Sequence, residues 1–268
     1  MKRRDMSRHP LEREARAWLR EAAATLRRTE ADCSAAVAEA SEAIIQCLET
    51  GGTVYFCGNG GSAADSQHLA AEFSGRFQIE RAALAAVSLT TNSSAITAIG
   101  NDYGYAHVFS RQLEGLGTPG DVLIAISTSG GAASVHRAVA VARRLRMTTI
   151  AMTGLKGRAF AASCDFALVT PHEATSHIQE GHIAMGHAVC LIVERAIFGA
   201  GNATMPRGAA KPRKAAEPGR AAKPRKAAKS GRAAKPRRAA EPGRAPKPGR
   251  APKPRAAAGS RTARQRTR

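Results

Sequence analysis

The chain has 268 residues and a formal charge of +20, but this charge is concentrated at one end. From Arg207 onward the sequence holds 22 of the 41 Lys and Arg residues and only two of the 21 Asp and Glu residues, so the part before it is formally neutral. The neutral part is long enough to bury a substantial core. It has neither an apolar run of about 18 residues nor a signal-peptide pattern, and its cysteines lack CxxC spacing. We therefore predict a cytoplasmic protein without a membrane span.

Residues 1–50 are predicted to form an N-terminal helical hairpin. Apolar residues such as Trp18, Val37 and Ile44 recur at the spacing of a helix face, and a polar stretch at 29–34 marks the expected break between two helices. Such a hairpin must bury its apolar face on a sheet or on another copy of the chain.

Residues 53–72, TVYFCGNGGSAADSQHLAAE, combine a buried strand, a glycine-rich turn and a helix. The run 53–57 is apolar and rich in β-branched and aromatic residues, as in a strand of a parallel sheet. Gly60 and Gly61 let the backbone turn tightly, and Ser62 is a suitable N-cap for the helix that follows. The free N–H groups at such a helix start favour an anion or a sugar hydroxyl as ligand.

His68 and Glu72 lie four residues apart in this predicted helix, so their side chains project from one face. An imidazole and a carboxylate at this spacing can share a divalent metal ion, or supply an acid and a base to one substrate. A surface hydrogen-bonded pair is the more frequent use of the same spacing. The pair alone therefore does not define a site.

Strands and helices alternate through the rest of the neutral part. A helix is predicted at about 132–146, and further strands are predicted at 82–89, 122–126, 148–152 and 166–169. This alternation predicts an α/β domain over 51–200, built on a doubly wound parallel sheet.

A second turn of small residues follows the strand at 122–126. Ser127, Thr128 and Ser129 precede two glycines and a helix, and three hydroxyls beside free backbone N–H groups suit a phosphate monoester. Two such turns in one sheet indicate a binding crevice at the carboxyl ends of the strands.

Asn101 and Asp102 lie in the polar stretch GNDYGY, after a short helix that is expected to begin near Ser94. They either bring polar groups to the edge of the sheet as ligands or form an Asn-Asp turn without a ligand.

A last helix is predicted from about Ser176 to Phe198. Within it, Glu180 and His187 are seven residues apart and nearly eclipse, so spacing alone favours Glu180 over Gln179 as the partner of His187. His182 is interpreted as a histidine facing solvent or an interface.

Taken together, the motifs CGNGGSAADSQHLAAEFSGRF, TAIGNDYGY, ISTSG and IQEGH resemble those of the SIS-domain sugar isomerases. The resemblance is close to the phosphoheptose isomerases and covers about residues 11–198. It implies an aldose–ketose isomerase that converts sedoheptulose 7-phosphate to D-glycero-D-manno-heptose 7-phosphate through an enediol. It also implies a homotetramer with its sites at subunit contacts.

Carried over residue by residue, the resemblance implies three adjoining subsites. The sugar would contact Asn59, Gly60, Gly61, Asn101 and Asp102, and the phosphate would contact Ser127, Thr128 and Ser129. One zinc ion per subunit would be bound by His68, Glu72, Gln179 and His187, with Glu72 and Gln179 also touching the substrate. Glu72 would act as base and His187 as acid, since moving a carbonyl between two carbons requires that a proton be removed and another returned.

Three positions depart from the family pattern. Ala132 stands where a further phosphate-contacting serine is usual, and Asn92 and Ser176 each replace a frequent aspartate. Losing one neutral hydroxyl contact costs about 1 kcal/mol of phosphate binding.

Residues 201–268 form a tail with a twelve-residue repeat, KPRKAAEPGRAA, that starts at Lys211. The repeats contain no large apolar residue, so we predict a disordered segment that resembles the tails of linker histones. A segment of this charge is expected to bind nucleic acid through its phosphates, without sequence preference. A solubilising extension without a partner is the other interpretation.

Two other functions remain open from the sequence. One is a catalytically idle SIS-domain adaptor that binds a replication initiator or DNA. The other is an isomerase or etherase of a different sugar phosphate, which the fold alone does not exclude.

Overall fold

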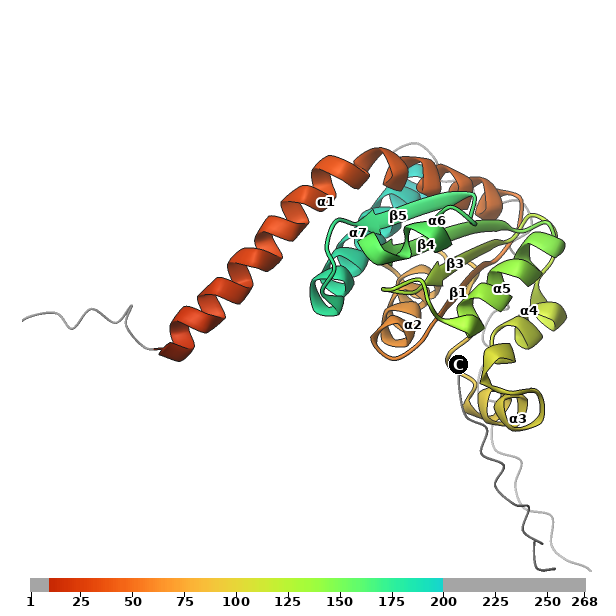
Figure 1. Cartoon of the computed structure of the whole chain (residues 1–268). Helices are drawn as coiled ribbons and strands as arrows, with labels where there is room; N and C mark the ends of the chain where they lie inside the picture. The colour runs from red at the N-terminus through yellow and green to blue at the C-terminus, as the bar shows by residue number, and fades with distance from the viewer. Residues whose placement is uncertain (1–9, 200–268) are drawn as a thin grey trace, which may run out of the picture. The chain divides into compact units, whose positions relative to one another are not determined.

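A five-stranded parallel sheet is the centre of the computed structural model, which describes residues 10–199 (Figure 1). The predicted tail at 201–268 lies outside the described residues. The strand order is β2-β1-β3-β4-β5, and each neighbouring pair is parallel. The strands are β1 (Val54–Gly58), β2 (Ala86–Ser88), β3 (Val122–Ile126), β4 (Thr148–Gly154) and β5 (Phe166–Thr170). This order confirms the predicted doubly wound α/β fold.

Helices cover both faces of the sheet. They are α1 (Pro10–Glu49), α2 (Gly61–Ser74), α3 (Ser93–Tyr103), α4 (Ser110–Leu116), α5 (Ala133–Arg144), α6 (Arg158–Ala161) and α7 (Thr175–Phe198), with two short 3-10 helices, η2 (Tyr105–His107) and η3 (Leu155–Gly157). Successive strand residues point to opposite faces. Phe56 and Ile124 therefore pack beneath α1, α2 and α7, whereas Cys57 and Ala125 pack beneath α4, α5 and α6.

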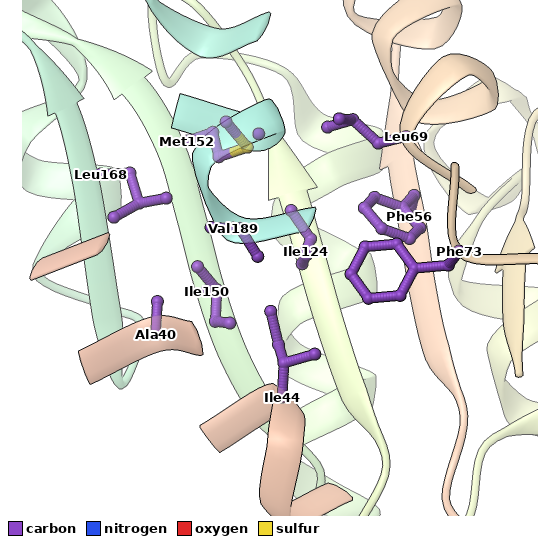
Figure 2. Close-up of a pocket in the computed structure, with 11 residues that line it drawn as sticks. Ala40, Ile44, Phe56, Leu69, Phe73, Ile124, Ile150, Met152, Leu168 and Val189 are labelled. Carbon is purple, nitrogen blue, oxygen red and sulfur yellow. The ribbon is translucent and has the colours of Figure 1, made fainter. Parts of the chain in front are cut away.

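The core beneath α1, α2 and α7 is closely packed (Figure 2). Ile44 of α1, Phe73 of α2 and Val189 of α7 meet Phe56 and Ile150 of the sheet around a residual cavity of about 10 Å³. The lining is apolar throughout, so the cavity lacks the polar partners that an ordered water or a sugar requires. This part of the fold is scaffold.

The predicted N-terminal hairpin is wrong, because residues 10–49 form the single helix α1. The polar residues at the expected break are accommodated within the helix. Thr29 Oγ1 donates to the carbonyl of Thr25 at 2.9 Å, and Ser34 Oγ donates to the carbonyl of Glu30 at 2.6 Å. Hydroxyls that bond back one turn are tolerated in a helix interior, and the stretch 29–34 contains no Gly or Pro to end it.

Three predicted boundaries also change. The N-cap residue of α2 is Gly60 and not Ser62. Ser62 lies inside the helix, and its side chain is buried. The second strand is confined to Ala86–Ser88. Helix α3 runs through Asn101 and Asp102 to Tyr103, where Gly104 ends it at a φ of 84°.

Helix α7 is the one helix in the described range that is long and apolar enough to cross a membrane by length and composition alone. Half of its most apolar window is buried in the fold. Since α7 packs against the sheet through residues such as Met185, Val189 and Val193, its apolar character is accounted for by the core.

Candidate active site

The site lies where the chain connections from β1 and β3 diverge. In the order β2-β1-β3-β4-β5, the connection from β1 leads to one edge of the sheet and that from β3 leads to the other, and ligands bind at such a switch point. The first turn (residues 58–61) and the second turn (residues 127–131) leave these two strands side by side. Asn59 Nδ2 in the first turn donates to Ser134 Oγ at 3.0 Å, so the first turn is bonded to the start of α5, the helix that follows the second turn.

A histidine–glutamate cluster, formed by His68, Glu72 and His187, lies beyond the first turn. His68 and Glu72 come from α2, and α7 brings in His187 from 119 residues along the chain. The two histidine Nε2 atoms are 2.9 Å apart, and His68 Nε2 is 3.4 Å from Glu72 Oε1. The side chain of His68 is 49% exposed and that of Glu72 is 25% exposed, so the cluster is accessible.

The donor atoms of this cluster fit a divalent metal ion. One ligand atom from each of the three residues lies within 4.8 Å of the other two. Two imidazole nitrogens that face each other need a proton or a cation between them. Two imidazole nitrogens and a carboxylate oxygen are donors that Zn²⁺ commonly takes.

Gln179, the fourth predicted ligand, lies at the beginning of α7, eight residues before His187. Its side-chain amide rests on Gly61, so closely that a side chain at position 61 would collide with it. The structure therefore groups three of the four predicted ligands and places Gln179 against the first turn.

The predicted phosphate residues lie together at the carboxyl end of β3. Thr153 Oγ1 donates to the carbonyl of Ser127 at 2.7 Å, and the N–H of Gly154 donates to the carbonyl of Thr128 at 3.0 Å. These bonds fix the second turn to β4. Ser127 is buried and Ser129 is exposed, so the second turn leads from the buried end of β3 to the protein surface.

The N-terminus of α5 adjoins this turn and has no side-chain cap, since Ala132 occupies the N-cap position. The unsatisfied N–H groups and the positive end of the helix dipole are thus available to an anion. Ala132 itself supplies no hydroxyl at this position.

Asn101 and Asp102 are both exposed at the end of α3, and Asn101 Nδ2 donates to Asp102 Oδ1 at 2.8 Å. The same segment contributes a residue that the sequence interpretation missed. Tyr105 donates its hydroxyl to Asn59 Oδ1 at 2.9 Å and so connects the 100–105 segment to the first turn. The tyrosine within GNDYGY was the available signal, but its partner is 46 residues away.

Two sequence interpretations in α7 are wrong. Glu180 accepts a hydrogen bond from His177 or donates one to it, with Oε2 and Nδ1 at 2.8 Å, and does not join His187. His182 is fully buried, not placed at solvent or an interface. Burial lowers the pKa of His182 to about 4, although a backbone group of Thr153 opposes this shift.

Comparisons with known proteins identify the family of this chain. A family model described as SIS domain matches residues 17–154. The phosphoheptose isomerase of Akkermansia muciniphila is 53% identical over 152 residues, which cover 57% of this chain and 80% of that relative. The one from Rhodospirillum rubrum is 51% identical over 154 residues, covering 58% of this chain and 82% of that relative. A solved phosphoheptose isomerase structure from Neisseria gonorrhoeae, 45% identical, covers 69% of this chain and 98% of its own, with a TM-score of 0.65.

Proposed function

The chain belongs to the SIS domain family and, within it, to the phosphoheptose isomerases, and on this premise we propose that it interconverts sedoheptulose 7-phosphate and D-glycero-D-manno-heptose 7-phosphate. One observation carries the proposal beyond family membership. His68, Glu72 and His187 come from two helices and meet in one cluster, and α2, which carries two of them, begins at the first turn. A catalytically idle adaptor would need no such cluster, and the comparisons give that alternative no support.

Glu72 and His187 have the groups that the reaction needs. Moving the carbonyl from C2 to C1 requires that a proton leave C1, that an enediol form and that a proton return to C2. We assign the removal of the proton to the carboxylate of Glu72 and the supply of a proton to the imidazole of His187. No other reactant is consumed, because the sugar phosphate is only rearranged.

We assign the metal position to one zinc ion per subunit, held by His68, Glu72 and His187 with Gln179 as the fourth ligand. Their nitrogen and oxygen donors suit zinc. When bound, the ion would polarise the carbonyl or orient the neighbouring hydroxyls of the sugar. The protein's own part is to fix the donors on α2 and α7 and to hold the proton-transferring groups beside them.

The substrate is held by the two turns and the end of α3. Ser127, Thr128 and Ser129, with the uncapped start of α5, would bind the phosphate. Backbone and side-chain groups of the first turn would bind the sugar chain, with Gln179 beside them. The residues that would contact the sugar are Asn59, Gly60, Gly61, Asn101 and Asp102.

We also assign a homotetramer in the cytoplasm. Several large apolar side chains on α1 are exposed in the single chain, including Leu11 (67%), Trp18 (51%) and Leu19 (67%). Large apolar side chains exposed along one helix are consistent with an interface between copies of the chain. Light scattering that reports a monomer at micromolar concentration would contradict the assignment.

Turnover of purified protein with heptose, hexose and pentose phosphates tests the function, with zinc content measured on the same sample. The proposal predicts turnover of sedoheptulose 7-phosphate well above that of the shorter sugars. Zinc-loaded protein that turns over a hexose or pentose phosphate and not the heptose would reject the substrate, and no turnover of any would reject the reaction.

For the tail, a second function is supported by one observation, its 22 basic against two acidic residues from Arg207 onward. We propose that it binds nucleic acid through the phosphate backbone, with an affinity that falls steeply as salt rises. Removal of the residues after Met205 is expected to abolish DNA retention at low salt and leave isomerisation intact. Retention by the shortened protein would place the nucleic-acid site elsewhere.

A further inference from the structure

A buried ion pair lies at the carboxyl end of α2, the end opposite the first turn. Arg81, in the segment after α2, and Glu194, in α7, are joined by a 2.8 Å contact between Nε and Oε1. Each side chain is only 2% exposed. A charge pair removed from water to this degree needs further polar partners, and both residues have them.

Glu194 accepts four hydrogen bonds, two at each carboxylate oxygen. Besides Arg81, the donors are the backbone N–H groups of Phe77 (3.0 Å), Gln78 (2.8 Å) and Ile79 (3.1 Å). Three consecutive amides are thus fixed by one carboxylate. The segment that follows α2 is anchored to α7 at this point.

Arg81 fixes the carboxyl end of α2. Its Nη2 donates to the carbonyl of Glu72 at 2.7 Å, and its Nη1 donates to the carbonyls of Phe73 at 2.9 Å and Gly75 at 3.3 Å. These are carbonyls of the last helical turn, which lack partners within a helix, and α2 has no basic residue of its own there. The guanidinium therefore supplies the cation that a helix carboxyl end favours.

The ion pair is connected to the candidate active site through α2 and through α7. Arg81 holds the backbone of Glu72, whose side chain belongs to the cluster. On α7, Glu194 follows His187 by seven residues, two helical turns, and so lies on the same side of the helix. Phe77, whose N–H is bound by Glu194, places its ring 5.6 Å from the His187 ring, centroid to centroid.

We propose that Arg81 and Glu194 are positioning residues for the isomerisation, which set the placement of α2 relative to α7 and hold Phe77 against His187. Through these contacts they maintain the distances among His68, Glu72 and His187. The inference rests on the proposed function for its effect on turnover. Its effect on metal affinity is independent of the substrate.

Stability and positioning lead to different expectations for this pair. Removing one partner of a buried ion pair leaves an uncompensated charge, whereas replacing both partners by apolar residues does not. Replacing both partners here still leaves the amides of residues 77–79 without their acceptor, so a lower unfolding midpoint is expected in either role. Zinc affinity and kcat therefore separate the two roles.

The test compares the double variant Arg81→Met/Glu194→Leu with the wild-type protein. The control is Arg144→Met/Glu114→Leu, which removes an exposed ion pair of the same length, 2.8 Å between Arg144 Nη2 and Glu114 Oε1. Zinc affinity by chelator competition, kcat, KM and the midpoint of thermal unfolding are measured for all three proteins.

The proposal predicts that the double variant folds, binds zinc about tenfold more weakly and loses about 10- to 100-fold in kcat, as other residues that orient metal ligands do, while KM changes about twofold. The control should match the wild-type protein in zinc affinity, kcat and KM. A folded double variant with unchanged zinc affinity and kcat would overturn the proposal, whatever its unfolding midpoint.

Phe77→Leu decides the outcome if the double variant does not fold. It leaves the ion pair in place and removes only the ring beside His187, and a several-fold loss of zinc affinity or kcat is expected. Unchanged values in this variant would overturn the proposal. If the wild-type protein isomerises none of the sugar phosphates, the proposed function fails, and the zinc affinities still decide the positioning role.

Discussion

The first turn and the second turn both follow a buried strand, and each contains a glycine with positive φ, 56° at Gly60 and 69° at Gly130. They differ in where the chemistry lies. Beyond the first turn, α2 carries His68 about two and Glu72 about three helical turns from its start, whereas the second turn bears its hydroxyls on the turn itself. One strand–turn–helix unit thus carries the proposed reactive groups along its helix, and the other carries the proposed phosphate-binding groups at the start of its helix.

Replacing His187 by Ala tests the catalytic side of this comparison and should have the largest effect. The variant loses both a metal donor and the proposed acid, so kcat is expected to fall by about 10²- to 10⁴-fold. Inorganic phosphate should still inhibit or bind as in the wild-type protein, because the second turn is intact. A variant that loses phosphate binding together with turnover would show that the two sides do not act separately.

On the catalytic side, lowering the pH should reduce the free energy of unfolding through His182, which lies in α7 between Gln179 and His187. Burial lowers the pKa of this residue to about 4 from its ordinary 6.5, so the unfolded chain binds the proton first as the pH falls. Stability present above pH 6.5 is therefore lost between about pH 6.5 and pH 4, by about 3 kcal/mol.

The matched variant for this effect is His182→Leu, which has no titratable group. The free energy of unfolding, measured by denaturant titration from pH 4 to pH 7, should depend less on pH in the variant than in the wild-type protein. Parallel curves for the two proteins would assign the acid sensitivity to other groups.

Alanine substitutions at the two positive-φ glycines should sharpen the contrast between the turns. At Gly130 an added Cβ would lie 2.7 Å from Gly157 Cα and 2.9 Å from Phe160 Cβ, whereas at Gly60 it would meet nothing within 4 Å. Gly130→Ala should cost about 3 kcal/mol of unfolding free energy, and Gly60→Ala about 1 kcal/mol from backbone strain alone. Equal losses of unfolding free energy in the two variants would mean that the second turn shifts to make room for the added Cβ.

Restoring a serine at the start of α5 should have the smallest effect. Ala132→Ser adds a hydroxyl at the N-cap beside the proposed phosphate position, and we expect KM to fall about fivefold, equivalent to about 1 kcal/mol. A higher unfolding midpoint with unchanged KM would show that the new hydroxyl caps the helix and makes no contact with the phosphate.

The sequence predicted best what depends on neighbouring residues. Strand β3 was predicted with its observed bounds and β1 to within one residue, because buried parallel strands are short apolar runs next to turn residues. The single helix α1 was missed because the polar residues Thr29 and Ser34 bond within the helix, which composition does not reveal. The fold class needed only the alternation of elements.

The prediction of the candidate site was less accurate for contacts that depend on tertiary packing. The helical wheel favoured Glu180, but seven residues extend about 10 Å along an α-helix, and Glu180 pairs with the nearer His177. The burial of His182 and the contact of Tyr105 with Asn59 depend on elements far apart in the sequence. The meeting of α2 with α7 that forms the histidine–glutamate cluster was supplied by family resemblance, since spacing within either helix does not specify it.

The most direct test of the account is the exchange of substrate hydrogen with solvent in D₂O, followed by NMR for the wild-type protein and Glu72→Gln at equal zinc content. If Glu72 removes the proton, the wild-type protein should introduce deuterium at the carbon next to the carbonyl, and the variant should do so at least about 100-fold more slowly. A zinc-loaded variant that exchanges as fast as the wild-type protein would contradict the assignment of Glu72 as the base.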